Sequence, residues 1–421
     1  MKSSLGASFE GFLKSYFSPT VKGVRANTLK ISADGFEMLA PVTLDGCVPW
    51  EKNGFYALGD SLGKNIWHAA GLYYVQEPSA MCAVPELEIE GGERVLDLCA
   101  APGGKSTQIA QAMRGEGLLV SNEIDYKRST ILASNLERLG VKNSVVTCRT
   151  PEYLAERFPE YFDKILVDAP CSGEGMFKKE ENAIPEWSLE NVGRCAERQE
   201  KILESAAQML AGGGRLVYST CTFAPEEDEG QIDNFLKKHK NFKLISMKKL
   251  LPHEVRGEGH FCAALEKTDG ERNEIRPVKY PAVQKNILNV FNEWAKDTLN
   301  IEIKNVFVKG ERSIVWLYSL PDGMPEMGRI PQSAGVLLAT VNPLNGTIQP
   351  AHSLAMSLKK DEAKHIEVDE KTALNFLRGL TFECPESEKG WRVVTVKGFP
   401  IGWCKAVNGV AKNHLPKGLR I

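Results

Sequence analysis

Two cysteines occupy matching positions in the sequence, each shortly after an apolar run that is typical of a buried strand. Cys171 follows the run 164–167 and the step Asp168-Ala169-Pro170, and Cys221 follows the run 215–218. In an open α/β sheet, residues just beyond the carboxyl ends of neighbouring strands project into one crevice, where ligands bind. The two thiols are therefore predicted to meet there, where a thiolate could act as a nucleophile. Simple packing of two inert, buried cysteines is the alternative that this pattern leaves open.

A small-residue turn is the second feature that could carry chemistry. It reads Cys99-Ala100-Ala101-Pro102-Gly103-Gly104-Lys105, between a predicted strand over 95–98 and a predicted helix over 106–113. Small residues let a ligand approach the backbone, and free amides at a helix start favour electronegative groups. Glu123 follows the next predicted strand, about 20 residues later, where a nucleotide-binding sheet holds ribose hydroxyls with a carboxylate. The combination predicts a nucleoside cofactor, with a generic glycine-rich turn as its alternative.

A nucleoside triphosphatase is a rival interpretation of the same turn. Gly104-Lys105-Ser106 resembles the end of a P-loop, and Ile165-Leu166-Val167-Asp168 resembles a Walker B strand. A P-loop requires glycine five residues before Gly104, where this chain has Cys99. Pro102 also removes one of the amides that would hold phosphate. The sequence therefore argues against a triphosphatase.

The elements that must position these residues alternate regularly from about residue 93 to 220. Predicted strands cover 95–98, 118–120, 144–146, 164–168 and 215–219, and predicted helices cover 106–113, 125–139 and 191–210. Gly212-Gly213-Gly214 is expected to end the last of these helices. A further helix is expected to open within 224–229, with proline and acids in its first turn, and to fix the strand end that carries Cys221. The alternation predicts an α/β fold with a doubly wound, mostly parallel sheet.

Composition limits the class of protein. The chain has 421 residues, which predicts two to four domains, and its 43% hydrophobic and 25% charged residues are those of a soluble protein. No apolar run reaches the length of a membrane-spanning helix and the start lacks a signal-peptide core, so we expect a cytoplasmic protein without membrane partners. The 10 cysteines include no CxxC pair, so we expect free thiols and no metal site.

Charge is uneven along the chain although the net charge is only −2. Residues 389–421 contain several lysines and arginines and no acid, together with Trp391, Phe399 and Trp403. Basic and aromatic residues together are typical of a nucleic-acid surface, and a solvated basic face is the alternative. Alternating residues and turn signals in this stretch predict a small β-rich terminal domain.

The motifs together resemble a known family. The turn 99–105, the segment Asp168-Ala169-Pro170-Cys171-Ser172-Gly173-Glu174-Gly175 and the segment Tyr218-Ser219-Thr220-Cys221-Thr222 are similar to those of the Sun-type RNA cytosine-5 methyltransferases. Residues 24–30, 74–81 and 412–420 resemble the bacterial RsmF branch, which modifies 16S ribosomal RNA. The resemblance implies a Rossmann-like methyltransferase sheet, S-adenosylmethionine as cofactor, and 16S RNA of the small subunit or its precursor as partner.

Roles for individual residues follow from the resemblance. It implies Cys221 as the nucleophile that adds to cytosine and Cys171 as the group that assists product release. Spacing does not fix that order, since DNA cytosine methylation in related folds uses the cysteine of the Pro-Cys step. Asp168 would bind the amino edge of the flipped cytosine and, like the turn, border the cofactor. Lys105 would lower the pKa of a thiol or hold Asp168 in place.

For the cofactor, the resemblance implies that residues 99–105 surround the methionine part of S-adenosylmethionine and that Glu123 holds its ribose. Arg128 matches a further binding position of the family. Where relatives often carry an acid near the adenine, this chain has Thr147-Cys148-Arg149-Thr150. That contact is therefore expected from the backbone or not at all.

The expected domain organisation has four parts. Residues 1–72, which include Arg25, Lys30 and Trp50, are expected to form an α+β, ferredoxin-like RNA-binding module, and residues 73–270 the methyltransferase domain. Residues 271–340 are expected to form a linker and intermediate domain, preceded by a polar stretch at 268–274, and residues 341–421 a PUA-like RNA-binding domain. A transfer RNA cytosine-5 methyltransferase and a catalytically silent RNA-binding ribosome-assembly factor remain alternatives.

Overall fold

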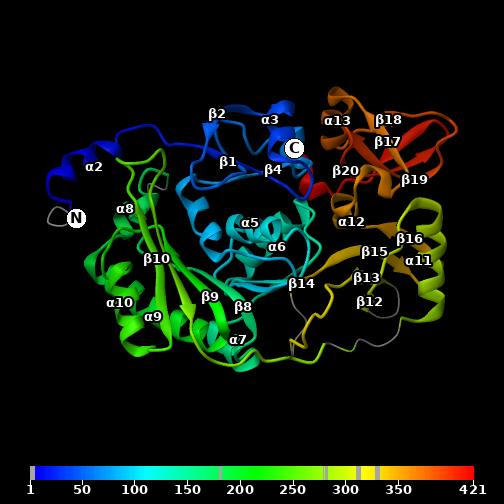
Figure 1. Cartoon of the computed structure of the whole chain (residues 1–421). Coiled ribbons are helices and arrows are strands. Elements are labelled where there is room, and N and C mark those ends of the chain that lie inside the picture. Colours follow the sequence, from blue (N-terminus) through cyan, green and yellow to red (C-terminus); the bar gives the residue numbers. More distant parts are fainter. Residues whose placement is uncertain (1–4, 180–182, 278, 280–282, 310–313, 328–331) are drawn as a thin grey trace.

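The computed structural model describes residues 5–179, 183–277, 279, 283–309, 314–327 and 332–421. In these residues the strands form four sheets, with the largest at the centre of the molecule (Figure 1). None of the described helices is long and apolar enough to cross a lipid bilayer.

The N-terminal sheet has the strand order β2-β3-β1-β4 and is antiparallel throughout. Its β-α-β-β-α-β succession is the ferredoxin-like motif. Polar side chains begin its helices, since Ser32 accepts a hydrogen bond from the Gly35 amide and Asn65 from the His68 amide. The elements are α2 (Phe9–Ser15), β1 (Gly23–Ala26), α3 (Ala33–Leu39), β2 (Thr43–Cys47), β3 (Gly54–Leu58), α4 (Ile66–Ala69) and β4 (Tyr73–Val75).

The central sheet has the order β10-β11-β9-β8-β5-β6-β7-β14. Strands β9, β8, β5, β6 and β7 are parallel, and the other three are antiparallel to their neighbours. This confirms the predicted doubly wound sheet. Its strands are β5 (Arg94–Asp97), β6 (Leu118–Asn122), β7 (Ser144–Thr147), β8 (Phe162–Asp168), β9 (Leu210–Thr220), β10 (Phe242–Leu250), β11 (His260–Lys267) and β14 (Ser333–Ala334).

Helices connect the strands of the central sheet. The connecting helices are α5 (Gly104–Ala112), α6 (Tyr126–Arg138), α7 (Pro151–Arg157), α9 (Leu189–Met209) and α10 (Glu229–Lys238), and short turns of helix lie at η2 (Ser79–Cys82), η3 (Val84–Leu87), η4 (Glu174–Met176) and α8 (Ala183–Glu186). Strand β5 is flanked by β6 on one side and β8 on the other, so the order in which the chain adds strands to the sheet reverses at β5. Sheets of this kind bind ligands at the point of reversal.

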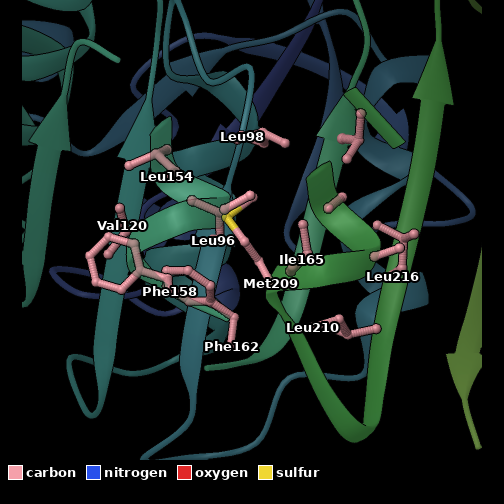
Figure 2. Packing of buried hydrophobic residues seen from close by; sticks show 14 of the residues in the cluster. Leu96, Leu98, Val120, Leu154, Phe158, Phe162, Ile165, Met209, Leu210 and Leu216 are labelled. Carbon is pink, nitrogen blue, oxygen red and sulfur yellow. The ribbon is translucent and has the colours of Figure 1, made fainter. Parts of the chain in front are cut away.

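The hydrophobic core under this sheet sets the strand ends in place. Figure 2 shows strand residues Leu96, Ile165 and Leu216 packing with side chains of α7 and of the α9–β9 junction. Each of these three strand residues is fully buried, as apolar side chains between a sheet and its helices must be.

Two details of the predicted elements are wrong. The three glycines 212–214 lie inside β9 rather than ending α9, which already ends at Met209. The helix after Cys221 begins at Glu229, because residues 225–228 form turns and the side chains of Glu227 and Asp228 turn inward to bind Ser172 and Thr220.

The C-terminal third contains the two remaining sheets. The first has the order β12-β13-β15-β16 and the second β17-β19-β20-β21-β18. Their elements are α11 (Lys285–Thr298), β12 (Val306–Lys309), β13 (Val315–Ser319), β15 (Val336–Asn342), β16 (Thr347–Pro350), α12 (His352–Ser357), β17 (His365–Val368), α13 (Glu370–Leu377), β18 (Phe382–Glu383), β19 (Gly390–Val396), β20 (Phe399–Val407) and β21 (Val410–Asn413). The terminal domain is thus β-rich, as predicted.

The aromatic part of the predicted nucleic-acid surface is wrong. Trp391 and Trp403 are buried in the hydrophobic cluster that includes residues of α11 and α12, because the central part of β19 and β20 is covered on both faces. The polar stretch 268–274 is also bound to the central domain rather than loose, since Arg272 pairs with Asp163 at 2.6 Å.

The N-terminal module and the C-terminal domain pack against one another. A single hydrophobic cluster contains Val24 of β1 and Phe36 of α3 together with Phe376 and Val394 of the C-terminal domain. Figure 1 shows α3 and α13 on the same side of the central sheet. The flanking modules therefore pack against one another on one side of the central sheet.

Candidate active site

The two predicted cysteines meet. Strands β8 and β9 are parallel neighbours with Asp168 opposite Ser219, so the loops that follow them lie side by side. The sulfur atoms of Cys171 and Cys221 are 3.3 Å apart, and both residues are partly exposed. The hydrogen bond with Cys221, followed by burial, raises the pKa of Cys171 well above its ordinary value. The raised pKa favours the protonated thiol at Cys171.

Asp168 lies at the end of β8 and is held from several sides. Its Oδ2 is 2.8 Å from the Nζ of Lys105, and its Oδ1 accepts a hydrogen bond of 2.8 Å from the Ser219 hydroxyl. Burial would raise the pKa of Asp168, but the charge of Lys105 and further contacts outweigh it and hold that pKa below its ordinary value. A carboxylate therefore stands beside the thiols with its side chain 32% exposed.

His260 is a member of the site that the sequence did not reveal. It begins β11, is 2% exposed, and places its Nε2 3.7 Å from the Oδ1 of Asp168. Burial and the nearby charge of Lys105 lower the pKa of His260 to about 3, so the imidazole is neutral. The only sequence signal was a histidine opening an apolar strand, which is also typical of core histidines.

The loops that carry the cysteines are cross-linked by hydrogen bonds. The Ser172 and Thr222 hydroxyls are 2.9 Å apart, and the Gly175 amide donates to the Cys221 carbonyl at 2.8 Å. Glu174 accepts hydrogen bonds from the Thr222 hydroxyl and the Phe223 amide. These contacts fix the separation of the two sulfur atoms.

The small-residue turn follows β5 and leads into α5. Gly103 has a φ of 114°, a left-handed conformation that favours glycine, and Leu132 lies 3.2 Å from where its Cβ would be. Arg25 of β1 is fully buried and donates to the Gly104 carbonyl at 2.9 Å, so the N-terminal module supports this turn. Arg128 donates to the Ala101 carbonyl at 3.0 Å.

Carboxylates next to the turn fit a nucleoside cofactor. Glu123 is 4% exposed and lies 3.4 Å from Arg128, and Asp97 binds the Ser106 hydroxyl with one oxygen. The other oxygen of Asp97 is buried and has no partner among the described residues, and burial raises the pKa of Asp97 to about 7. The unpartnered oxygen of Asp97 suits an amino or hydroxyl group of a nucleoside cofactor.

The stretch 147–150 supplies no acid, as the sequence showed. The Thr147 hydroxyl donates to Asn122 at 2.8 Å, and the Arg149 amide donates to the same side chain at 3.1 Å. Thr150 caps the start of α7, where its side chain accepts a hydrogen bond from the Tyr153 amide. Within the part of the chain that the structure describes, no group of three or more histidine, cysteine or acidic residues is placed to hold a metal ion.

Comparison with known proteins gives the family. The model of the 16S rRNA methyltransferase RsmB/F family matches residues 84–266, that of the RsmF N-terminal domain residues 1–78, and that of the RsmF PUA domain residues 363–421. The ribosomal RNA small subunit methyltransferase F of Vibrio vulnificus is 33% identical over 440 residues, which cover 95% of this chain and 91% of that protein. The chain belongs to the RsmF family.

Other relatives agree with this RsmF-family assignment. The protein of the same description from Shewanella oneidensis is 31% identical over 450 residues, covering 98% of this chain and 93% of its own. A methyltransferase homologue of Pyrococcus horikoshii has a solved structure that is 30% identical in sequence, with a TM-score of 0.57. The match covers 62% of this chain and 91% of that one. The chain is thus a methyltransferase with the S-adenosylmethionine-dependent fold, as the sequence predicted.

Proposed function

We propose that this protein methylates carbon 5 of cytosine in 16S ribosomal RNA, using S-adenosylmethionine and a covalent bond between Cys221 and the base. The observation that carries the proposal is the meeting of two thiols at 3.3 Å beside an ionised Asp168 at the switch point of the sheet. The relatives named as small-subunit RNA methyltransferases support the choice of substrate.

The first step creates a nucleophile on the base. The Cys221 thiolate adds to carbon 6 of the flipped cytosine, and the electron pair of the 5,6 double bond gives an enamine that is nucleophilic at carbon 5. S-adenosylmethionine, when bound, supplies the electrophilic methyl group. Lys105 helps this step from its place beside Asp168, because its charge also interacts with Cys221.

Asp168 is proposed to orient and polarise the base. Its ionised carboxylate is an acceptor for the amino group of cytosine, and its charge favours a proton on the adjacent ring nitrogen as the thiolate adds. Lys105 and Ser219 occupy the inner side of the carboxylate, which leaves the exposed part of the side chain for the base.

Release requires loss of the proton on carbon 5. Cys171, after losing its own proton to solvent, takes the proton from carbon 5, and the C–H electron pair re-forms the 5,6 double bond. The carbon–sulfur pair returns to Cys221 as a thiolate, and 5-methylcytosine leaves. The cycle therefore releases one proton in total. The 3.3 Å separation of the sulfur atoms supports a role for Cys171 beside the carbon to which Cys221 adds.

RNA recognition is assigned to the flanking modules. We propose domains at 1–72, 73–270, 271–340 and 341–421, of which the first and the last bind RNA in the cytoplasm. Six basic residues of the stretch 389–421 are exposed and could contact phosphates, namely Lys389, Lys397, Lys405, Lys412, Lys417 and Arg420. Unstacking the cytosine requires such support from outside the catalytic sheet.

A methyl-transfer assay tests the proposal. The purified protein is incubated with radiolabelled S-adenosylmethionine and unmodified 16S RNA, small subunits or transfer RNA. We expect label in 5-methylcytosine of 16S RNA, either naked or in subunits. Label in transfer RNA alone would favour the transfer RNA enzyme, and binding to RNA without label on any substrate would favour the silent assembly factor.

A further inference from the structure

Glu227 is a buried acid that the proposed reaction does not use. It lies on the turn after Cys221, where its side chain is fully buried. Its carboxylate accepts a hydrogen bond from the Ser172 amide at 3.0 Å and another from the Ser172 hydroxyl. Glu227 thus reaches from the loop of one cysteine to the loop of the other.

Gln199 of α9 completes this contact. Its Nε2 donates to Glu227 at 2.8 Å and to the Pro170 carbonyl at 3.1 Å. The residue before Cys171 and the residue after it are therefore both held by the Glu227–Gln199 pair. Among the described residues, no other pair of linked side chains is hydrogen-bonded to both neighbours of an active-site cysteine.

The position of Glu227 is itself fixed. The Tyr218 hydroxyl of β9 donates to the Glu227 carbonyl at 2.7 Å. Burying a carboxylate is costly unless hydrogen bonds compensate, and here three donors supply them. An ordinary turn does not require such a group, so its placement against Cys171 calls for a functional reason.

We propose that Glu227 is a positioning residue for Cys171, which orients that thiol toward carbon 5 for the release step. This inference rests on the proposed function. The pair holds the backbone on both sides of Cys171, so the direction of its sulfur depends on Glu227. Cys221 lies on its own strand end and does not depend on the pair in the same way.

The charges around the two sulfur atoms agree with this division. Lys105 interacts with Cys221. Glu227 instead acts on Cys171, where its charge adds to the hydrogen bond with Cys221 and to burial in raising the pKa of that thiol. A thiol with a raised pKa holds its proton in the resting site and is the stronger base once ionised. A cation near one sulfur and an anion near the other thus make the two cysteines unequal.

The test compares Glu227→Gln with Glu226→Gln, which removes the same charge from an exposed neighbouring side chain. Each variant and the wild type is incubated with unmodified 16S RNA and S-adenosylmethionine, and both turnover and covalent protein–RNA complex are measured on denaturing gels. For Glu227→Gln we expect turnover to fall about tenfold and the complex to rise about tenfold, since misplacing a reacting group by about 1 Å costs up to about 100-fold. Glu226→Gln should match the wild type.

Other results overturn the inference. A purely structural role would lower turnover and complex together, and an unchanged Glu227→Gln variant would show that the contact is idle. If Glu227→Gln does not fold, Gln199→Ala should still accumulate the complex, because it removes the hydrogen bonds to Pro170 and Glu227 and leaves those between Glu227 and Ser172. A normal level of complex in that variant would contradict the proposal. Absence of methyl transfer by the wild type would instead overturn the proposed function itself.

Discussion

The molecule contains two pairs of neighbouring cysteines with similar geometry and different surroundings. The sulfur atoms of Cys171 and Cys221 are 3.3 Å apart, and those of Cys82 and Cys262 are 3.6 Å apart. In each pair a hydrogen bond between the sulfur atoms is the largest cause that raises the pKa of one thiol. Proximity and a raised pKa therefore do not distinguish a reactive pair from an inert one.

The surroundings do distinguish them. Cys82 and Cys262 are 3% and 1% exposed and belong to an apolar cluster with Val84 and Leu87. Cys171 and Cys221 are partly exposed and follow the ends of parallel strands, and Asp168 ends the strand that precedes Cys171. Access for a substrate is what the second pair lacks, since the charge of Lys105 reaches Cys82 as well as Cys221.

The largest expected effect comes from the charge beside the reactive pair. Asp168→Asn should lower methyl transfer by about 1,000-fold, within the range of about 100- to 10,000-fold that a group assisting proton transfer supplies. The measurement is the single-turnover rate with 16S RNA. Cys262→Ala is the control at the other pair and should retain the wild-type rate. Equal losses in the two variants would remove the distinction between the pairs.

The second prediction is that the two pairs differ in their rates of alkylation. Cys171 or Cys221 should react with iodoacetamide at least about 100-fold faster than Cys82 or Cys262, because a buried thiol reacts only after a local opening that costs about 3 kcal/mol or more. Peptide mass spectrometry after timed quenching gives the rate at each cysteine. Comparable rates at all four would show that the second pair is not closed.

The third prediction concerns pH and strand β11, which carries both His260 and Cys262. The pKa of His260 is lowered from 6.5 to about 3 in the fold, so the unfolded chain binds the proton first and stability is lost as pH falls below 6.5. At pH 5 the loss from this group is about 2 kcal/mol. His260→Asn should therefore lose about 2 kcal/mol less stability than the wild type between pH 7 and pH 5 in urea unfolding. Equal losses of stability in the variant and the wild type would contradict a buried, neutral imidazole at His260.

The smallest effect is expected at the inert pair itself. Cys82→Ala should lower the free energy of unfolding by about 1 kcal/mol, as small core truncations do, and leave methyl transfer unchanged. Thermal unfolding and the transfer assay check the two statements on one preparation. A loss of activity at unchanged stability would assign chemistry to the second pair.

The sequence predicted the central sheet and the meeting of Cys171 and Cys221 because both depend on local patterns. Apolar runs marked the strands, and parallel strand ends placed Asp168 and both thiols together. Lys105 was expected either to hold Asp168 or to act on a thiol, and the 2.8 Å contact shows that it holds Asp168.

Residues that depend on tertiary contacts were not predicted. Glu227 was assigned to the first turn of a helix, but that helix starts two residues later because the carboxylate binds Ser172 instead. Gln199 and His260 reach the site from α9 and β11, and neither has a local signal that differs from ordinary burial. Trp391 and Trp403 looked like surface aromatics because periodicity alone does not say which face of a terminal strand is covered.

The most direct test of the central claim compares Cys171→Ser with Cys221→Ser, each incubated with unmodified 16S RNA and S-adenosylmethionine. The unequal roles of the two thiols predict that Cys171→Ser accumulates a covalent protein–RNA complex that carries the transferred methyl group, and that Cys221→Ser forms none. A complex in Cys221→Ser and none in Cys171→Ser would reverse the roles and contradict the account.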